Sequence, residues 1–293
     1  MNAHSPPLIL ALATILLATP TPGFAQVRTD RSRHESRGND DTTTPVRVQR
    51  IGRTDIYHFE NAASVYFFEA KMVINADGAP KAYHRDTGRG VDHLANAGST
   101  GNWWGIVTDT GDSGGNPILQ GAGDPAPGFY VSGTALQDST KSNGDQNRYV
   151  NSETVPFYVL PRRIHLPVKI GDFGFVINQR NNASSGCIFA DIGPEDRIGE
   201  GSIALAKALG IQSDPKAKGS EDTYVYVIFS NSAMGWPLDL EFINVHAKAL
   251  FEKWGGMERL QQVLPLAVMC AGKRYKWKNY DSVHSKPRQY VDR

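Results

Sequence analysis

The sequence has little of three things that identify whole classes of protein: cysteine, charge of one sign, and long apolar runs. Its 293 residues include 2 cysteines, so a disulfide-rich scaffold is excluded and a buried core must supply the stability. Its formal net charge is +1 at pH 7, which provides no global field to attract a nucleic acid. Whether Cys187 and Cys270 pair is left open, because pairing depends on a distance that the sequence does not give.

The longest apolar run lies near the N-terminus. Leu8–Thr19 is too short for a membrane span, and prolines and small residues follow it. This pattern is typical of a secretory signal peptide, so we expect residues 1–25 to be removed and the protein to be secreted or periplasmic. Residues 26–49 are polar and charged with almost no apolar periodicity, and we expect a disordered linker there.

From residue 50 to residue 272, short apolar runs alternate with turn residues, without the strand–helix alternation of a doubly wound parallel sheet. The expected strands are Val65–Ile74, Trp103–Thr108, Phe129–Gly133, Pro156–Leu160, Phe173–Asn178, Gly186–Ala190 and Tyr224–Ser230. The expected helices are Gly201–Leu209, Leu240–Trp254 and Met257–Cys270, the last interrupted at Pro265. We therefore expect a mainly β (α+β) fold with a compact β-barrel-like core, a few helices at its C-terminal side, and a basic tail at 273–293.

The stretch Thr108–Leu119 contains Gly-Asp-Ser-Gly-Gly, the sequence around the nucleophile of chymotrypsin-like serine proteases. Such a serine requires a histidine and an aspartate supplied by two barrels. The histidines between His58 and Ser113 precede the serine by too few residues for one barrel and half of another. We therefore expect Asp112 and the neighbouring glycines to be turn residues of a hairpin.

Two acids near a short loop form the pattern that most indicates chemistry. Asp191 directly follows the expected strand Gly186–Ala190. Glu200 lies between two glycines, where a helix is expected to begin. Glycoside hydrolysis generally requires two carboxyl groups held at a fixed distance from each other. The glycines suit close passage of a polymer, and the helix dipole favours a negative charge. The alternative is that Asp191 and Glu200 only cap the loop and the helix.

The segment around these acids resembles the signature of the fungal-type chitosanases, glycoside hydrolase family 75. Ala-Asp-Ile-Gly at 190–193 stands where the family has Gly-Asp-Thr-Asn, and Gly-Glu-Gly-Ser at 199–202 where it has Gly-Glu-Ala-Ser. The resemblance covers about Val65 to Phe229 and is strongest at 171–211. It implies that Asp191 and Glu200 are the catalytic pair of an endo-acting, inverting chitosanase. The departures at 190–193 leave open a related amino-sugar polysaccharide as the substrate.

Within this pair we expect Glu200 to be the general acid and Asp191 the general base that activates water, although the sequence leaves the order of the roles open. Binding a glucosamine polymer requires carboxylates for the ammonium groups and aromatic faces for the rings. Our candidates for substrate binding are Asp77, Asp109, Trp104 and Tyr83, and the further acids considered are Asp86, Asp92, Asp112 and Asp124. Adjacent Trp103 and Trp104 point to opposite faces of a strand, so at most one faces the cleft.

No metal-ligand spacing, phosphate loop or dinucleotide fingerprint occurs, so we expect no metal and no cofactor. The expected partner is a polysaccharide substrate, with no nucleic acid and no membrane span, and we expect a monomer. The alternative function, from a different class, is a non-catalytic polysaccharide or cell-wall binding protein on the same fold. In that alternative Asp191 and Glu200 do no chemistry.

Overall fold

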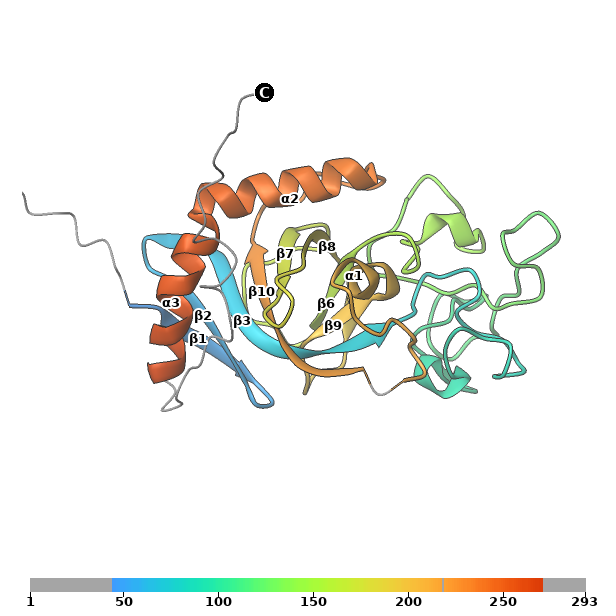
Figure 1. Ribbon diagram of the computed structural model, residues 1–293. Coiled ribbons are helices and arrows are strands. Elements are labelled where there is room, and N and C mark those ends of the chain that lie inside the picture. Colours follow the sequence, from blue (N-terminus) through green and yellow to red (C-terminus); the bar gives the residue numbers. More distant parts are fainter. Residues whose placement is uncertain (1–43, 218, 271–293) are drawn as a thin grey trace, which may run out of the picture. The chain divides into compact units, whose positions relative to one another are not determined.

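Pairing between strand edges closes most of the β structure into a barrel. The computed structural model describes residues 44–270 apart from residue 218. The strands of the main sheet are β1 (Val46–Ile51), β2 (Thr54–Phe59), β3 (Ala62–Asn75), β6 (Phe157–Pro161), β7 (Phe173–Asn178), β8 (Ser184–Gly193), β9 (Glu200–Ser202) and β10 (Ser220–Phe229). They follow the order β1-β2-β3-β10-β7-β8-β6-β9, and a further pairing of β3 with β9 closes six of them into a barrel (Figure 1). The fold is mainly β, as the sequence predicted.

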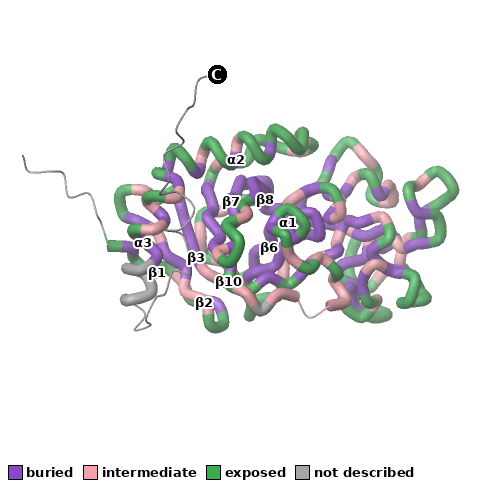
Figure 2. Tube along the Cα trace, in the orientation of Figure 1, coloured by how far each residue is buried: buried purple, intermediate pink, exposed green. Residues whose placement is uncertain are grey.

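The barrel strands are buried on both faces, which explains their nearly continuous apolar sequences. One face carries the cluster that contains Phe68, Met72, Tyr158, Phe189 and Tyr226. The other carries the cluster that contains Phe67, Phe157, Phe175, Ile188 and Val227, and the helices α2 (Leu240–Trp254) and α3 (Gly256–Cys270) pack against it. Because α2 and α3 lie outside the strands (Figure 1), the second cluster marks the outer face of the barrel and the first marks its interior. The barrel strands are buried along much of their length (Figure 2).

The helices begin and end where local chemistry dictates. The short helix α1 (Ile203–Ala208) starts after Ser202, whose hydroxyl accepts a hydrogen bond from the Leu205 amide. Asp239 caps α2 and Gly255 ends it in a left-handed conformation, so its predicted bounds are confirmed. The predicted interruption of α3 at Pro265 is wrong, because the helix continues to Cys270. Buried Leu260, Val263 and Leu264 hold α3 on the barrel despite the lost backbone donor.

The predicted domain limits need one correction. Residues 46–49, assigned to the linker, belong to β1, which pairs with β2 in a hairpin at the sheet edge. The prediction failed because an edge strand needs backbone pairing and little side-chain burial, and Val46 and Val48 are both exposed. The expected signal peptide, the rest of the linker and the basic tail lie outside the described residues. Between residues 44 and 270, none of the helices has the length and apolar character to cross a bilayer.

A long segment, 76–156, separates β3 from β6 and has little regular structure. It contains the strands β4 (Gly98–Ser99) and β5 (Asn102–Trp103), the 3-10 helices η1 (Leu94–Ala97) and η2 (Gln146–Arg148), and isolated bridges. The strands expected at Trp103–Thr108 and Phe129–Gly133 are therefore wrong as continuous strands, since only single residues such as Ile106 and Tyr130 make bridges. Frequent glycines and aspartates favour turns over ladders there.

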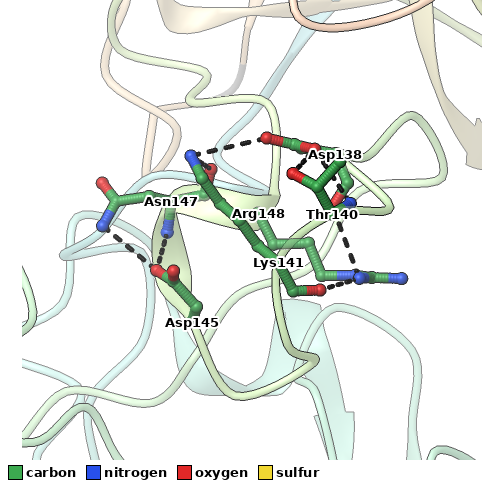
Figure 3. Close-up of polar contacts among 6 residues, drawn as sticks. All are labelled: Asp138, Thr140, Lys141, Asp145, Asn147 and Arg148. Carbon is green, nitrogen blue, oxygen red and sulfur yellow. Dashed lines mark hydrogen bonds and ion pairs between the residues drawn. The ribbon is translucent and has the colours of Figure 1, made fainter.

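Buried polar side chains take the place of a backbone ladder in this segment. The side chain of Gln146 donates to the carbonyl oxygens of Gly78 and Ser132 at 3.0 Å and accepts from the Ser132 amide at 2.8 Å. A second network holds the loop that precedes β6, in which Lys141 bonds Asp138 and Arg148 donates to the Lys141 carbonyl (Figure 3). The segment is thus tied to the turn after β3, where the candidate site begins.

Candidate active site

Two carboxylates lie on the outer face of the barrel, on either side of one residue of β6. Val159 pairs with Asp191 of β8 on one side and with Glu200 of β9 on the other. Laterally paired residues share a face, and strands lie about 4.8 Å apart, so the two Cα atoms are about 10 Å apart. The backbones of three strands therefore hold the pair, and its side chains point over Val159.

A bulge in β8 puts Asp191 on this face. Tyr158 pairs with Phe189 and the next residue, Val159, pairs with Asp191, so Ala190 is the extra residue. Phe189 points into the barrel, and strict alternation would send Asp191 inward as well. The extra residue turns it outward, as bulges beside functional sites often do. The predicted strand end at Ala190 is therefore wrong, because β8 continues to Gly193.

Glu200 lies in strand β9, which corrects the expectation that it starts a helix. Its neighbours in the pairing are Val73 of β3 and Val159, and α1 begins only at Ile203. The macrodipole argument therefore does not apply, and Ser202 rather than Glu200 caps the helix. Glu200 is 7% exposed, and its Oε1 accepts from Nε of the exposed Arg197 at 3.0 Å.

The glycines beside Glu200 serve the barrel rather than a passing polymer. Gly199 has a φ of +105°, and a Cβ there would lie 2.2 Å from the Lys71 carbonyl oxygen. A Cβ at Gly201 would lie 2.9 Å from the Leu205 side chain, inside the barrel. Both positions let β9 enter between β3 and β6, which closes the barrel and fixes Glu200.

Asp77 joins the pair from the turn that follows β3. The Tyr83 hydroxyl donates to its Oδ1 at 2.7 Å, and the Asn75 side chain donates to its Oδ2 at 3.3 Å. The carboxyls of Asp77 and Asp191 lie close enough to influence each other's protonation. Burial, then the charge of Asp191, holds the pKa of Asp77 well above its ordinary value.

Asp191 is also displaced from ordinary carboxylate behaviour. Its Oδ1 accepts a hydrogen bond from the Ala135 amide at 3.0 Å, which ties it to the long inserted segment. Burial, with a further contribution from the charge of Glu200, raises the pKa of Asp191 to about 7. Because Asp77 and Asp191 interact directly, the two carboxyls titrate as a pair that keeps one proton into the neutral range.

A cavity of about 510 Å³ opens above these side chains. Among the residues that line it are Asp77, Tyr83, Asp92, Trp104, Asp191 and Glu200. A second hollow of about 380 Å³ adjoins it, between the Thr108–Ser113 turn and the loop drawn in Figure 3. Trp104, Arg162, Asp191 and Ile192 line both hollows, so the two meet beside Asp191.

The residues predicted to bind substrate differ in whether the structure places them at the cavity. Trp104 is 64% exposed beside both hollows while Trp103 is buried, as the alternation between neighbours predicted. Tyr83 lines the cavity, but it is 2% exposed and so offers no ring face for stacking; it contributes its hydroxyl to Asp77. Asp109 is not brought to the cavity, because its two oxygens hold the backbone and side chain of Asn116 across a turn.

The Gly-Asp-Ser-Gly-Gly stretch is a turn, as expected. Asp112 accepts from the Gly114 amide at 2.9 Å and from the Thr110 hydroxyl at 3.0 Å. A bridge between Thr108 and Pro117 closes the hairpin. No histidine is recorded as a hydrogen-bond or ion-pair partner of Ser113 among the described residues, so nothing there supplies the base that a serine nucleophile requires.

Three further residues that line the cavity were not predicted from the sequence: Asn96, Arg162 and Arg197. Arg197 is three residues before Glu200, a spacing that could have suggested an ion pair. Arg162 directly follows β6 and Asn96 lies in η1, and only the folded chain brings the two to one cavity. Within the described part of the chain, no group of three or more His, Cys, Asp or Glu side chains is arranged to hold a metal ion.

No protein-family model and no curated protein matches this chain.

Proposed function

We propose that this protein is an endo-acting glycoside hydrolase that cleaves chitosan or a related amino-sugar polysaccharide with inversion. The observation that carries the proposal is the pair Asp191 and Glu200, which flank Val159 on one face and open into the same cavity. Their Cα separation of about 10 Å suits carboxyl groups roughly 6.5–9.5 Å apart, the gap that leaves room for a water molecule. The apolar stretch near the N-terminus supports export to the periplasm or the medium.

The surroundings of the two acids favour roles opposite to those expected from the sequence. Asp191, with its pKa raised to about 7, is suited to protonate the leaving glycosidic oxygen. Glu200, ion-paired with Arg197, is suited to accept a proton from the attacking water. Water adds to the anomeric carbon as the bond to the leaving oxygen breaks, and the proton lost by water goes to Glu200. Burial is the largest influence that keeps the proton on Asp191 until it is donated, and Asp77, held by Tyr83, lines the same cavity.

The hollows support a polymer as the substrate. They meet beside Asp191, so a chain could lie across the acids with sugars on both sides of the cut. Trp104 is exposed where they meet, and its indole offers a flat face on which a sugar ring can stack. Acidic residues outnumber basic ones around the larger cavity, which favours ammonium-bearing sugars.

The test is release of reducing ends from partly acetylated chitosan by the wild type and by Glu200→Gln and Asp191→Asn. Each substitution keeps the shape of the side chain and removes its ability to carry the proton. We expect activity in the wild type and a loss of about 10³-fold or more in each variant, since either acid is required in the transition state. Asp86→Asn, at an exposed residue that lines neither hollow, is the control and should retain activity.

The same experiment distinguishes the proposed hydrolase from the alternative, a non-catalytic binding protein. A polysaccharide-binding protein without catalysis would release no reducing ends in any form, and both substitutions would leave its binding to chitosan intact. Activity that survives Glu200→Gln would contradict the assignment of this pair.

A further inference from the structure

Asp92 is a buried carboxylate at the wall of the cavity, outside the pair assigned to catalysis. It is 4% exposed and lines the same cavity as Glu200. Its Oδ1 takes two hydrogen bonds, from the His93 amide at 2.7 Å and from the Asn96 side chain at 2.8 Å. Between residues 44 and 270, no group is recorded as donating to its Oδ2. One oxygen therefore fixes the group and the other remains for whatever enters the cavity.

Asn96 connects this carboxylate to the exposed tryptophan. Its side-chain amide donates to Asp92, and its backbone oxygen accepts from Trp104 Nε1 at 2.8 Å. The flat apolar surface and the carboxylate are thus held on the same residue, at the same wall of the cavity. An exposed indole and a charge that share one support form a surface that recognises one ring together with its cationic substituent.

The neighbouring cations are already engaged. Lys216 lies close enough to lower the pKa of Asp92, but its ammonium donates to the carbonyl oxygens of Thr87 and Gly90. His93 contributes its backbone amide to Asp92, and its side chain lowers the same pKa. Burial is the largest influence and raises it. A buried carboxylate of this kind gains most from a cation that contacts it directly.

We propose that Asp92 and Trp104 form a subsite for one unacetylated glucosamine residue, with the ring on Trp104 and the ammonium on Oδ2 of Asp92. The proposal rests on the proposed function and specifies its substrate. An N-acetyl group would remove the positive charge and bring a bulkier neutral group against a buried carboxylate, which would then lose its water without gaining a partner. The subsite therefore selects for a free amine at one fixed position beside the bond that is cut.

The substitution Asp92→Asn tests the proposed subsite and changes the local structure little. An asparagine oxygen can still accept from His93 and Asn96, so the substitution replaces only the other oxygen, Oδ2, with an NH₂ group. The matched control is Asp86→Asn on the same loop. Asp86 is exposed, does not line the cavity, and uses Oδ1 to accept from the Gly88 amide, a bond that asparagine also preserves.

Two measurements are made. In the first, kcat/KM of Asp92→Asn should fall about 10- to 100-fold on fully deacetylated chitosan, the worth of one charge-assisted contact, and by much less on highly acetylated chitosan. Asp86→Asn should match the wild type on both substrates. Equal losses on both polymers, or no loss on either, would overturn the proposal; thermal unfolding confirms that the variants are folded.

The second measurement does not depend on turnover. Binding of a glucosamine tetramer to Glu200→Gln is measured by calorimetry, with and without Asp92→Asn in the same chain. We expect the second substitution to weaken binding of this tetramer and to leave binding of the N-acetylglucosamine tetramer unchanged. If the wild type cleaves no polymer, the proposed function fails, while this binding experiment still decides the role of Asp92: equal binding of the glucosamine tetramer with and without the substitution would contradict it.

Discussion

Three carboxyl groups, those of Asp77, Asp191 and Glu200, line one cavity, and their surroundings differ. Desolvation raises the pKa of both Asp77 and Asp191, and the charge of Asp191 raises that of Asp77 further. Glu200 is instead paired with Arg197. Separate surroundings therefore give neighbouring carboxyls different roles, which is how one site supplies both an acid and a base.

This arrangement predicts how stability depends on pH. The pKa of Asp191 is about 7 in the folded protein and near the ordinary value of 3.8 in the unfolded chain. The folded state then binds more protons between these values, so the free energy of unfolding falls as pH rises from 4 to 7. Below pH 4 Asp191 is protonated in both states and does not change the free energy of unfolding. Above pH 7 its ionisation lowers the free energy of unfolding by up to about 4 kcal/mol.

Asp191→Asn should remove this cost while its oxygen still accepts from Ala135. Urea unfolding should therefore find the variant equal to the wild type near pH 4 and more stable at pH 8. A variant that is less stable than the wild type at pH 8 would mean that the carboxylate is stabilised, rather than penalised, by its surroundings.

The sequence predicted some of these residues for physical reasons and missed others. Opposite orientation of Trp103 and Trp104 follows from backbone geometry alone, so it could be predicted. Whether Tyr83 or Asp109 faces the cavity depends on the path of a long irregular segment, which has no periodicity to read. The bulge that turns Asp191 outward is equally hidden, because an extra residue in a ladder has no composition of its own.

At the scale of elements, the short strand β9 links stability to the site. Its residues 200–202 pair with β3 on one side, and Glu200 and Gly201 pair with β6 on the other, so one element both closes the barrel and carries Glu200. Gly199 enters it with a φ of +105° and no space for a Cβ. A substitution there acts on fold and chemistry together.

Gly199→Ala should therefore destabilise the protein by about 2 kcal/mol or more, because it adds a strained φ to a contact with the Lys71 carbonyl. Activity should fall further than stability explains, since Glu200 follows directly. The control is Gly123→Ala, where a Cβ would meet nothing within 4 Å and φ is not positive. Chemical unfolding of both variants makes the comparison, and equal stability of the two would contradict this role for Gly199.

Elements with strong apolar patterns were predictable and others were not. β7 and α2 have their predicted bounds, because continuous burial and a well-capped amphipathic helix leave clear signals. β9 was taken as part of a helix because its three residues have no pattern of their own and precede a genuine helix. Its assignment depends on partners far away in the chain.

At the scale of the molecule, the six-stranded barrel supplies a rigid wall and the segment 76–156 shapes what lies above it. The mainly β class follows from the sequence, whereas closure depends on the single long-range pairing of β3 with β9. The two hollows that meet beside Asp191 also depend on this segment. The two hollows leave space for sugar residues on both sides of the bond that would be cleaved.

An open groove predicts cleavage within the polymer rather than from its ends. The viscosity of a chitosan solution should fall early, while few reducing ends have formed. Trp104→Ala should weaken this effect by raising KM more than it lowers kcat, since stacking holds the ground state as well as the transition state. Viscosity that falls only in proportion to reducing ends would indicate an enzyme that works from chain ends.

The most direct measurement follows the anomeric proton of the first products by NMR during cleavage of a β-linked glucosamine oligosaccharide. Two carboxylates separated by a water molecule predict that the α anomer forms first and that the β anomer grows in later by mutarotation. Initial formation of the β anomer would show retention and contradict the geometry assigned to Asp191 and Glu200. No new anomer from this or any other amino-sugar polymer would contradict the hydrolase itself.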